Sequence, residues 1–102
     1  MSDIASLHKS LVARILEGKG QASPEIRRAA FDGVGLAEPV HTFVDKVAHR
    51  ARMITDADNG TLRKAGLSED QIYELVVCAA IGQATRQYES ALAALSAATG
   101  SD

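Results

Sequence analysis

Cys78 is the only cysteine of the chain, so it is the only possible thiol nucleophile. A functional thiol needs partial exposure and a nearby cation or helix amino terminus that lowers its pKa. Cys78 instead lies inside the apolar run from Leu75 to Gly82, where a free cysteine behaves as a small hydrophobic residue. We therefore predict a structural role for it. A single cysteine also excludes an intramolecular disulfide, which favours a reducing, cytoplasmic setting.

The histidines are the other candidates for chemistry, and they are dispersed at His8, His41 and His49. No two of them have the spacing of three or four residues that places metal ligands on one helical face. We therefore predict no metal site and no cofactor. His41 and Asp45 could pair on a helix and act as a general base if a cleft enclosed them, and His49 is a second weak candidate.

Charge gives little indication of a partner, because the formal net charge is only -2. The chain has no strongly basic character, so we do not expect nucleic-acid binding. Two short basic clusters, Arg27 with Arg28 and His49 with Arg50 and Arg52, fall near the ends of expected helices. There we expect exposed cations that complement the helix dipole.

The elements that must position these residues are predicted to be helices. Apolar residues make up 46% of the chain but aromatic residues only 4%, a composition that suits close helix packing better than a sheet. A chain of 102 residues is expected to form one domain, residues 1–102, around one core. Caps, prolines and glycines predict five helices, at about 3–17, 24–32, 39–51, 56–65 and 69–97.

Apolar spacing predicts an apolar face on two of these helices. In the first helix Ile4, Leu7, Leu11 and Ile15 form one stripe. In the third helix the expected apolar face comprises Val40, Phe43, Val44, Val47, Ala48 and Ala51.

The last helix has the clearest start signal. Ser68 and Gln71 have capping-box spacing, and Leu67 with Ile72 has the spacing of a hydrophobic staple. This helix should be about 40 Å long, which exceeds the size of a compact 100-residue globule.

Because Leu75 to Gly82 is apolar on all sides and the other helices are short, we expect a second copy of the chain to bury part of this helix. The tail from Ala98 to Asp102 is expected to fray. The longest apolar run is far shorter than the ~20 residues that cross a bilayer, so neither membrane insertion nor export is expected.

Three stretches carry a family resemblance: Phe43–Val47, Ile54–Asp58 and Leu62–Glu74. In these stretches the chain resembles the alkylhydroperoxidase D-like and carboxymuconolactone decarboxylase superfamily, in the half of the fold that follows the catalytic helix. The resemblance covers roughly the last 60 residues and implies an all-helical, oligomeric fold. Redox members use a Cys-x-x-Cys pair with a glutamate and histidines, whereas this chain has one cysteine.

The sequence therefore favours a non-catalytic, homo-oligomeric helical protein that resembles a shortened alkylhydroperoxidase D-like domain. Its partners would be further copies of the chain, with a full-length relative as another possibility. The alternative is an enzyme with a site at a subunit interface. That enzyme would be either a thiol-dependent peroxide reductase that uses Cys78 with an outside thiol, or an acid/base catalyst that uses His41 or His49.

Overall fold

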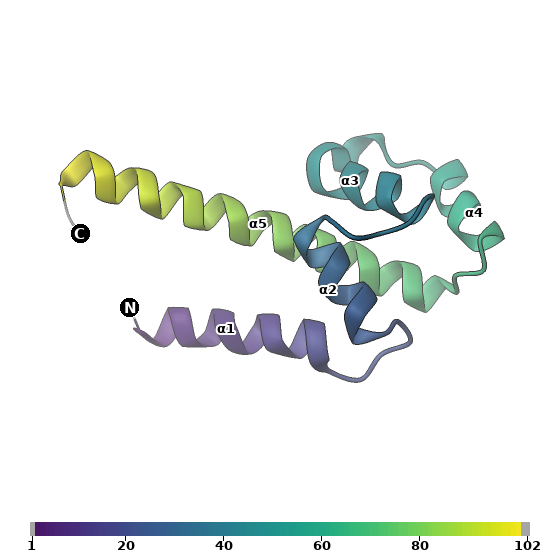
Figure 1. Cartoon of the computed structure of the whole chain (residues 1–102), viewed down its shortest axis with the longest axis horizontal. Coiled ribbons are helices and arrows are strands. Elements are labelled where there is room, and N and C mark those ends of the chain that lie inside the picture. Colours follow the sequence, from purple (N-terminus) through teal and green to yellow (C-terminus); the bar gives the residue numbers. More distant parts are fainter. Residues whose placement is uncertain (1, 101–102) are drawn as a thin grey trace.

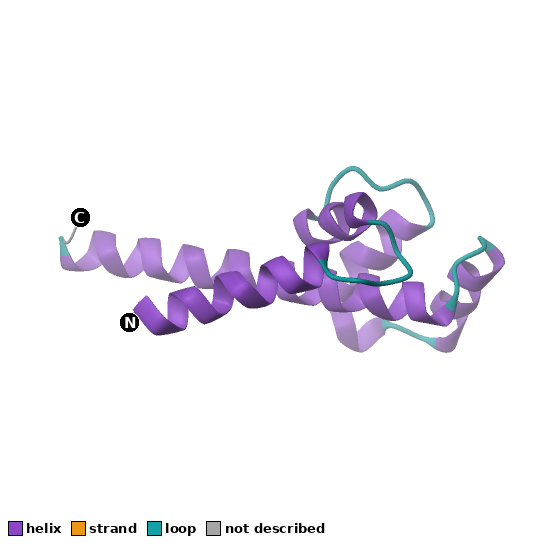
Figure 2. Cartoon of the chain, turned by 90° about the horizontal axis from the view of Figure 1, so that it is seen from below, coloured by secondary structure: helices purple, strands orange, loops and turns teal. Residues whose placement is uncertain are grey.

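The computed structural model describes the backbone of residues 2–100 and the side chains of residues 6–100. Helix accounts for 79% of the chain, and the described residues contain no strand, so the predicted all-α class is confirmed (Figure 2). Five α-helices and one 3₁₀ turn follow one another: α1 (Ser2–Glu17), α2 (Pro24–Asp32), α3 (Val40–Arg50), η1 (Ala51–Met53), α4 (Asp56–Lys64) and α5 (Glu69–Thr99).

Local capping explains most of the helix boundaries. The Ser23 hydroxyl accepts a hydrogen bond from the Ile26 amide at 3.2 Å, and Pro24 occupies the first turn of α2, where its missing N–H costs nothing. Gly33 ends α2 in the left-handed region with a φ of 75°. The predicted capping box of α5 is present: the Ser68 amide donates to Gln71 Oε1 at 2.8 Å, and the Gln71 amide donates to Ser68 Oγ at 3.1 Å.

Helix α4 begins with a second capping box, formed by Thr55 and Asp58. The Thr55 amide donates to Asp58 Oδ2 at 2.8 Å, and Lys46 Nζ of α3 lies 3.0 Å from the same oxygen. The hydrogen bond from the Thr55 amide has the largest effect, followed by that from Lys46, and both lower the pKa of Asp58. The carboxylate thereby joins α3 to the start of α4.

The end of α3 differs from the prediction at Ala51. Phe43, Val44 and Val47 are buried as expected, but Arg50 leaves helical geometry at φ -145° and ψ 48°. The chain then makes the η1 turn, so Ala51 becomes exposed instead of extending the apolar face. The helical period therefore ends one residue earlier than the sequence suggested.

Helix α5 is the element on which the others pack (Figure 1). Its buried residues Ile72, Leu75, Cys78 and Ala79 share one core with Ala30 and Phe31 of α2, the buried face of α3, Leu62 of α4 and Leu16 of α1. Gly82 allows the closest approach, because a Cβ atom there would overlap the Phe31 carbonyl oxygen. That oxygen, at the unpaired carboxyl end of α2, accepts from Arg86 Nη1 at 2.6 Å.

The apolar run of α5 is covered by its own chain more completely than expected. Leu75, Cys78 and Ala79 are each no more than 1% exposed, and Gly82 is also buried. Uncovered apolar surface lies later in the helix, at Leu92 and Leu95, which are 47% and 61% exposed. One face of this run is thus covered by the chain itself, whereas Ala80 is exposed and Val76, Val77 and Ile81 are only partly buried.

The molecule is elongated because α1 and the second half of α5 project together from the body (Figures 1 and 2). Its principal extents are 51 × 28 × 21 Å, and its radius of gyration is 15.4 Å, against about 13 Å for a compact chain of 100 residues.

Helix α5 continues through Ala98 and Thr99 to Gly100, so these residues are not frayed as predicted. Residues 101–102 lie outside the described part.

No helix in the described part of the chain combines the length and the apolar character that crossing a membrane would require.

Gly82→Ala should destabilise the fold by roughly 3 kcal/mol, because the new methyl group must displace the backbone of α2 from α5. Chemical unfolding followed by circular dichroism measures this loss. Gly60→Ala is the matched control: nothing lies within 4 Å of the added methyl group. The control should gain up to about 1 kcal/mol in helix propensity. Equal stabilities for the two variants would contradict the proposed contact.

Candidate functional site

The thiol of Cys78 faces the end of α1 and not the solvent. Its residue is 1% exposed, and Sγ lies 4.0 Å from the carbonyl oxygen of Ile15. Burial raises the pKa of Cys78 to about 11; the charge of Arg27 opposes this shift, whereas that of Glu74 adds to it. The thiol is therefore protonated at neutral pH, which suits a core residue and not a nucleophile.

A hollow of about 210 Å³ lies beside Cys78. Arg14, Lys19, Arg27, Tyr73 and Glu74 contribute to its wall. The hollow thus has three cationic side chains and one carboxylate in its wall. Cys78 contributes to the same wall.

Arg27 was expected to be an exposed cation, but it is only 5% exposed. Its Nη1 donates to the Ile15 carbonyl oxygen at 3.0 Å, whereas its Nε has no hydrogen-bond partner among the described residues. Ile15 belongs to the last turn of α1, where carbonyl groups lack helical partners and carry partial negative charge. Arg27 therefore caps α1, whereas its neighbour Arg28 is exposed and pairs with Asp32 at 3.2 Å.

Glu74 is the residue of this site whose role the sequence did not reveal. It looked like a solvent-facing charge, but its two carboxylate oxygens accept hydrogen bonds from the amides of Gln21 and Ala22, both at 2.8 Å. A Cβ atom at Gly20 would come within 2.6 Å of Glu74 Oε1, so a side chain there would displace the carboxylate from the loop amides. The carboxylate holds the α1–α2 loop and is not free to act as a base.

The histidines do not converge on one another or on Cys78. His8 of α1 lies 3.2 Å from the Thr85 hydroxyl of α5. The Asp45 carboxylate lies 3.8 Å from the His49 ring and 3.7 Å from the Arg50 guanidinium. Asp45, which we expected to pair with His41, therefore pairs with residues at the end of α3. No histidine lines any of the hollows described here. His41 and His49 therefore lie outside the walls of these four hollows, and a general base needs such an enclosed position.

The hollow between α2, the loop before α3 and the α4–α5 turn has a volume of about 400 Å³. Its wall is largely apolar and includes Ile26, Leu36, Leu67 and Leu75. Glu38 is the only ionisable group in this wall, and hydrogen bonds from the Thr42 hydroxyl and then the Thr42 amide lower its pKa. A single carboxylate already bound to Thr42 offers no second catalytic group.

Within residues 6–100 no cluster of three or more His, Cys, Asp or Glu side chains could hold a metal ion.

No protein-family model matches the chain, and comparisons with curated proteins and with solved structures gave no significant match. The site must therefore be interpreted from its own geometry.

Iodoacetamide should label native Cys78 slowly at neutral pH, because a pKa of about 11 leaves roughly one thiol in 10,000 ionised at pH 7. The rate should rise about tenfold per pH unit without a plateau below pH 9. Protein unfolded in urea provides the control and should react rapidly. A plateau near neutral pH in the native protein would identify an activated thiolate and contradict this assignment.

Glu74→Gln should lower the free energy of unfolding by about 2 kcal/mol, because an amide nitrogen cannot accept a hydrogen bond from the loop. Chemical unfolding tests this, with Glu89→Gln as control because Glu89 is exposed on α5. Wild-type stability in Glu74→Gln would show that the two amide contacts are dispensable.

Proposed function

We propose that this chain is a non-catalytic helical protein that functions as a homo-oligomer. The observation that carries the proposal is its surface area. The chain exposes 7018 Å², whereas a compact protein of 10.8 kDa exposes about 5,500 Å². The excess of roughly 1,500 Å² exceeds the ~800 Å² that each partner contributes to a typical stable interface.

The surroundings of the reactive residue types support the non-catalytic part of the proposal. Cys78 is buried and its pKa is raised. Glu74 is bound to the loop, and Asp45 pairs with exposed side chains of its own helix. Cys78 and Glu74 share the wall of one hollow, but the thiol is protonated there and the carboxylate is already bound to two loop amides, so neither is free to act as a nucleophile or a base.

A relationship to a shortened alkylhydroperoxidase D-like domain is part of the same proposal. The all-helical fold is compatible with it. Residues 54–74, which carry most of the resemblance, contain the capping boxes at the starts of α4 and α5. A single cysteine argues against the family's two-thiol chemistry in this chain, because a peroxide-derived sulfenic acid would lack a resolving thiol. Oligomerisation is thus the family property that we carry over, with other copies or a full-length relative as partner, in a cytoplasmic setting.

Analytical ultracentrifugation of the purified full chain tests the proposal. We expect a stable oligomer at micromolar concentration, because burying the excess surface would bring the exposed area per chain close to that of a compact protein. A monomer across the micromolar range would contradict the proposal. The measurement needs no ligand and leaves the sequence unchanged.

A further inference from the structure

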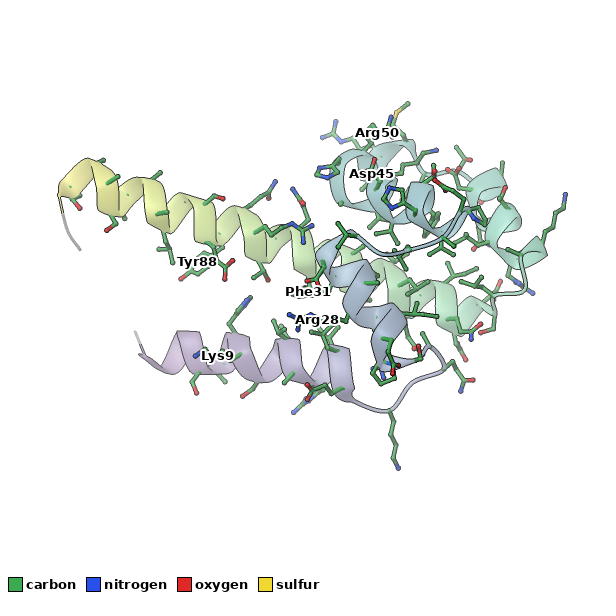
Figure 3. All side chains as sticks on the ribbon, viewed as in Figure 1. Lys9, Arg28, Phe31, Asp45, Arg50 and Tyr88 are labelled. Atoms are coloured by element: carbon green, nitrogen blue, oxygen red, sulfur yellow. The ribbon has the colours of Figure 1, made fainter. Side chains whose placement is uncertain are left out.

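The molecule departs from a compact shape at one structural feature, formed by residues 6–14 of α1 and 84–99 of α5, which we call the arm. The two helices run antiparallel and project together from the body (Figures 1 and 2). Few contacts join them: His8 lies 3.2 Å from the Thr85 hydroxyl, and its ring centroid lies 6.3 Å from that of Tyr88. Figure 3 shows Tyr88 directed from α5 toward α1.

Five large side chains of the arm remain exposed to solvent, and we call this set the arm face. Their exposed fractions are 69% for Leu7, 47% for Leu11, 53% for Tyr88, 47% for Leu92 and 61% for Leu95. They account for most of the exposed large apolar side chains of the described residues; the others are Ile26, Val34, Met53 and Tyr73, which lie on four different segments.

Helical geometry places the arm face on one flank of the pair. At about 100° per residue, Leu11 and Leu7 lie about 60° and 100° to one side of His8, which contacts α5. Tyr88, Leu92 and Leu95 lie about 60°, 20° and 80° to the same rotational side of Thr85, which contacts α1. The two helices face each other at this contact and run antiparallel. A rotation in the same direction about each helix axis, measured from the contact, therefore leads to the same side of the helix pair. The two helices therefore present one continuous apolar surface.

The end of α5 has few charged side chains. Residues 87–99 contain a single charged residue, Glu89, and otherwise consist of alanine, leucine, serine, threonine, glutamine and tyrosine. The segment continues a helix that is already formed, and alanine and leucine favour its propagation. Its leucines lack cover within the described chain, and its alanines would allow a second helix to approach closely.

From these observations we infer that the arm face is a dimer interface, in which the arms of two copies pack together about a two-fold axis into a four-helix bundle. This inference rests on the proposed function and specifies its interface and stoichiometry. A second copy fits best because the five side chains of the arm face are uncharged and because the excess surface per chain is large enough for a stable interface with another copy. The excess of roughly 1,500 Å² per chain lies within the roughly 1,000–2,500 Å² that each chain of an obligate homodimer buries.

The test replaces the arm face on each helix separately and measures mass by sedimentation. Leu92→Lys with Leu95→Lys should convert a dimer into a monomer, and Leu7→Lys with Leu11→Lys should do the same, because both helices contribute to the interface. Val34→Lys with Met53→Lys is the matched control. Both control residues are 64% exposed and lie outside the arm, so this variant should remain dimeric.

A milder variant guards against misfolding of the lysine variants. Leu92→Ala with Leu95→Ala retains helix propensity and should raise the dimer dissociation constant at least about tenfold, with the thermal transition of the body retained.

The possible results separate this inference from the proposed function. A dimeric wild type that dissociates in both arm variants and not in the control supports both. An oligomer that persists in the arm variants, or that contains more than two copies, overturns the four-helix interface and leaves the proposed function standing. A monomeric wild type overturns both.

Discussion

The contact between the carboxyl end of α2 and Gly82 of α5 determines how the rest of the chain is arranged. With no side chain at Gly82, the backbone at Phe31 lies directly on α5, and Arg86 supplies the donor that the Phe31 carbonyl would otherwise lack. This contact places Ala30 and Phe31 in the core. It also directs Arg27, one helical turn earlier, toward the last turn of α1. The position of α1 is therefore set in part through α2, and α1 also contacts α5 at Ile15 and at His8.

Features encoded by neighbouring residues were predictable from the sequence. The start of α5 at Ser68 and Gln71, and the start of α2 at Ser23 and Pro24, depend on spacings of a few residues and were correct. The end of α3 was misjudged because apolar spacing continues to Ala51 although the backbone leaves the helix at Arg50. No local pattern signals that change.

The errors about the candidate site arise from interactions across long stretches of sequence. Glu74 binds amides more than fifty positions earlier, and Arg27 is buried because α1 returns to cover it. A hydrophobic segment likewise does not reveal which part of it neighbouring helices will cover. The chemistry of Cys78 was easier to anticipate, because the apolar residues around it in sequence are also its neighbours in space.

Helix α4 is attached to the molecule differently from the other helices. Leu62 is its only buried residue, and both ends of the helix are defined by local caps together with the ion pair between Lys46 and Asp58. Opening this helix exposes little apolar surface, so its amide hydrogens should exchange with solvent through local fluctuations far more readily than those in the centre of α5. The outer side of α4 is thus the part of the body where sequence change is least constrained by the core.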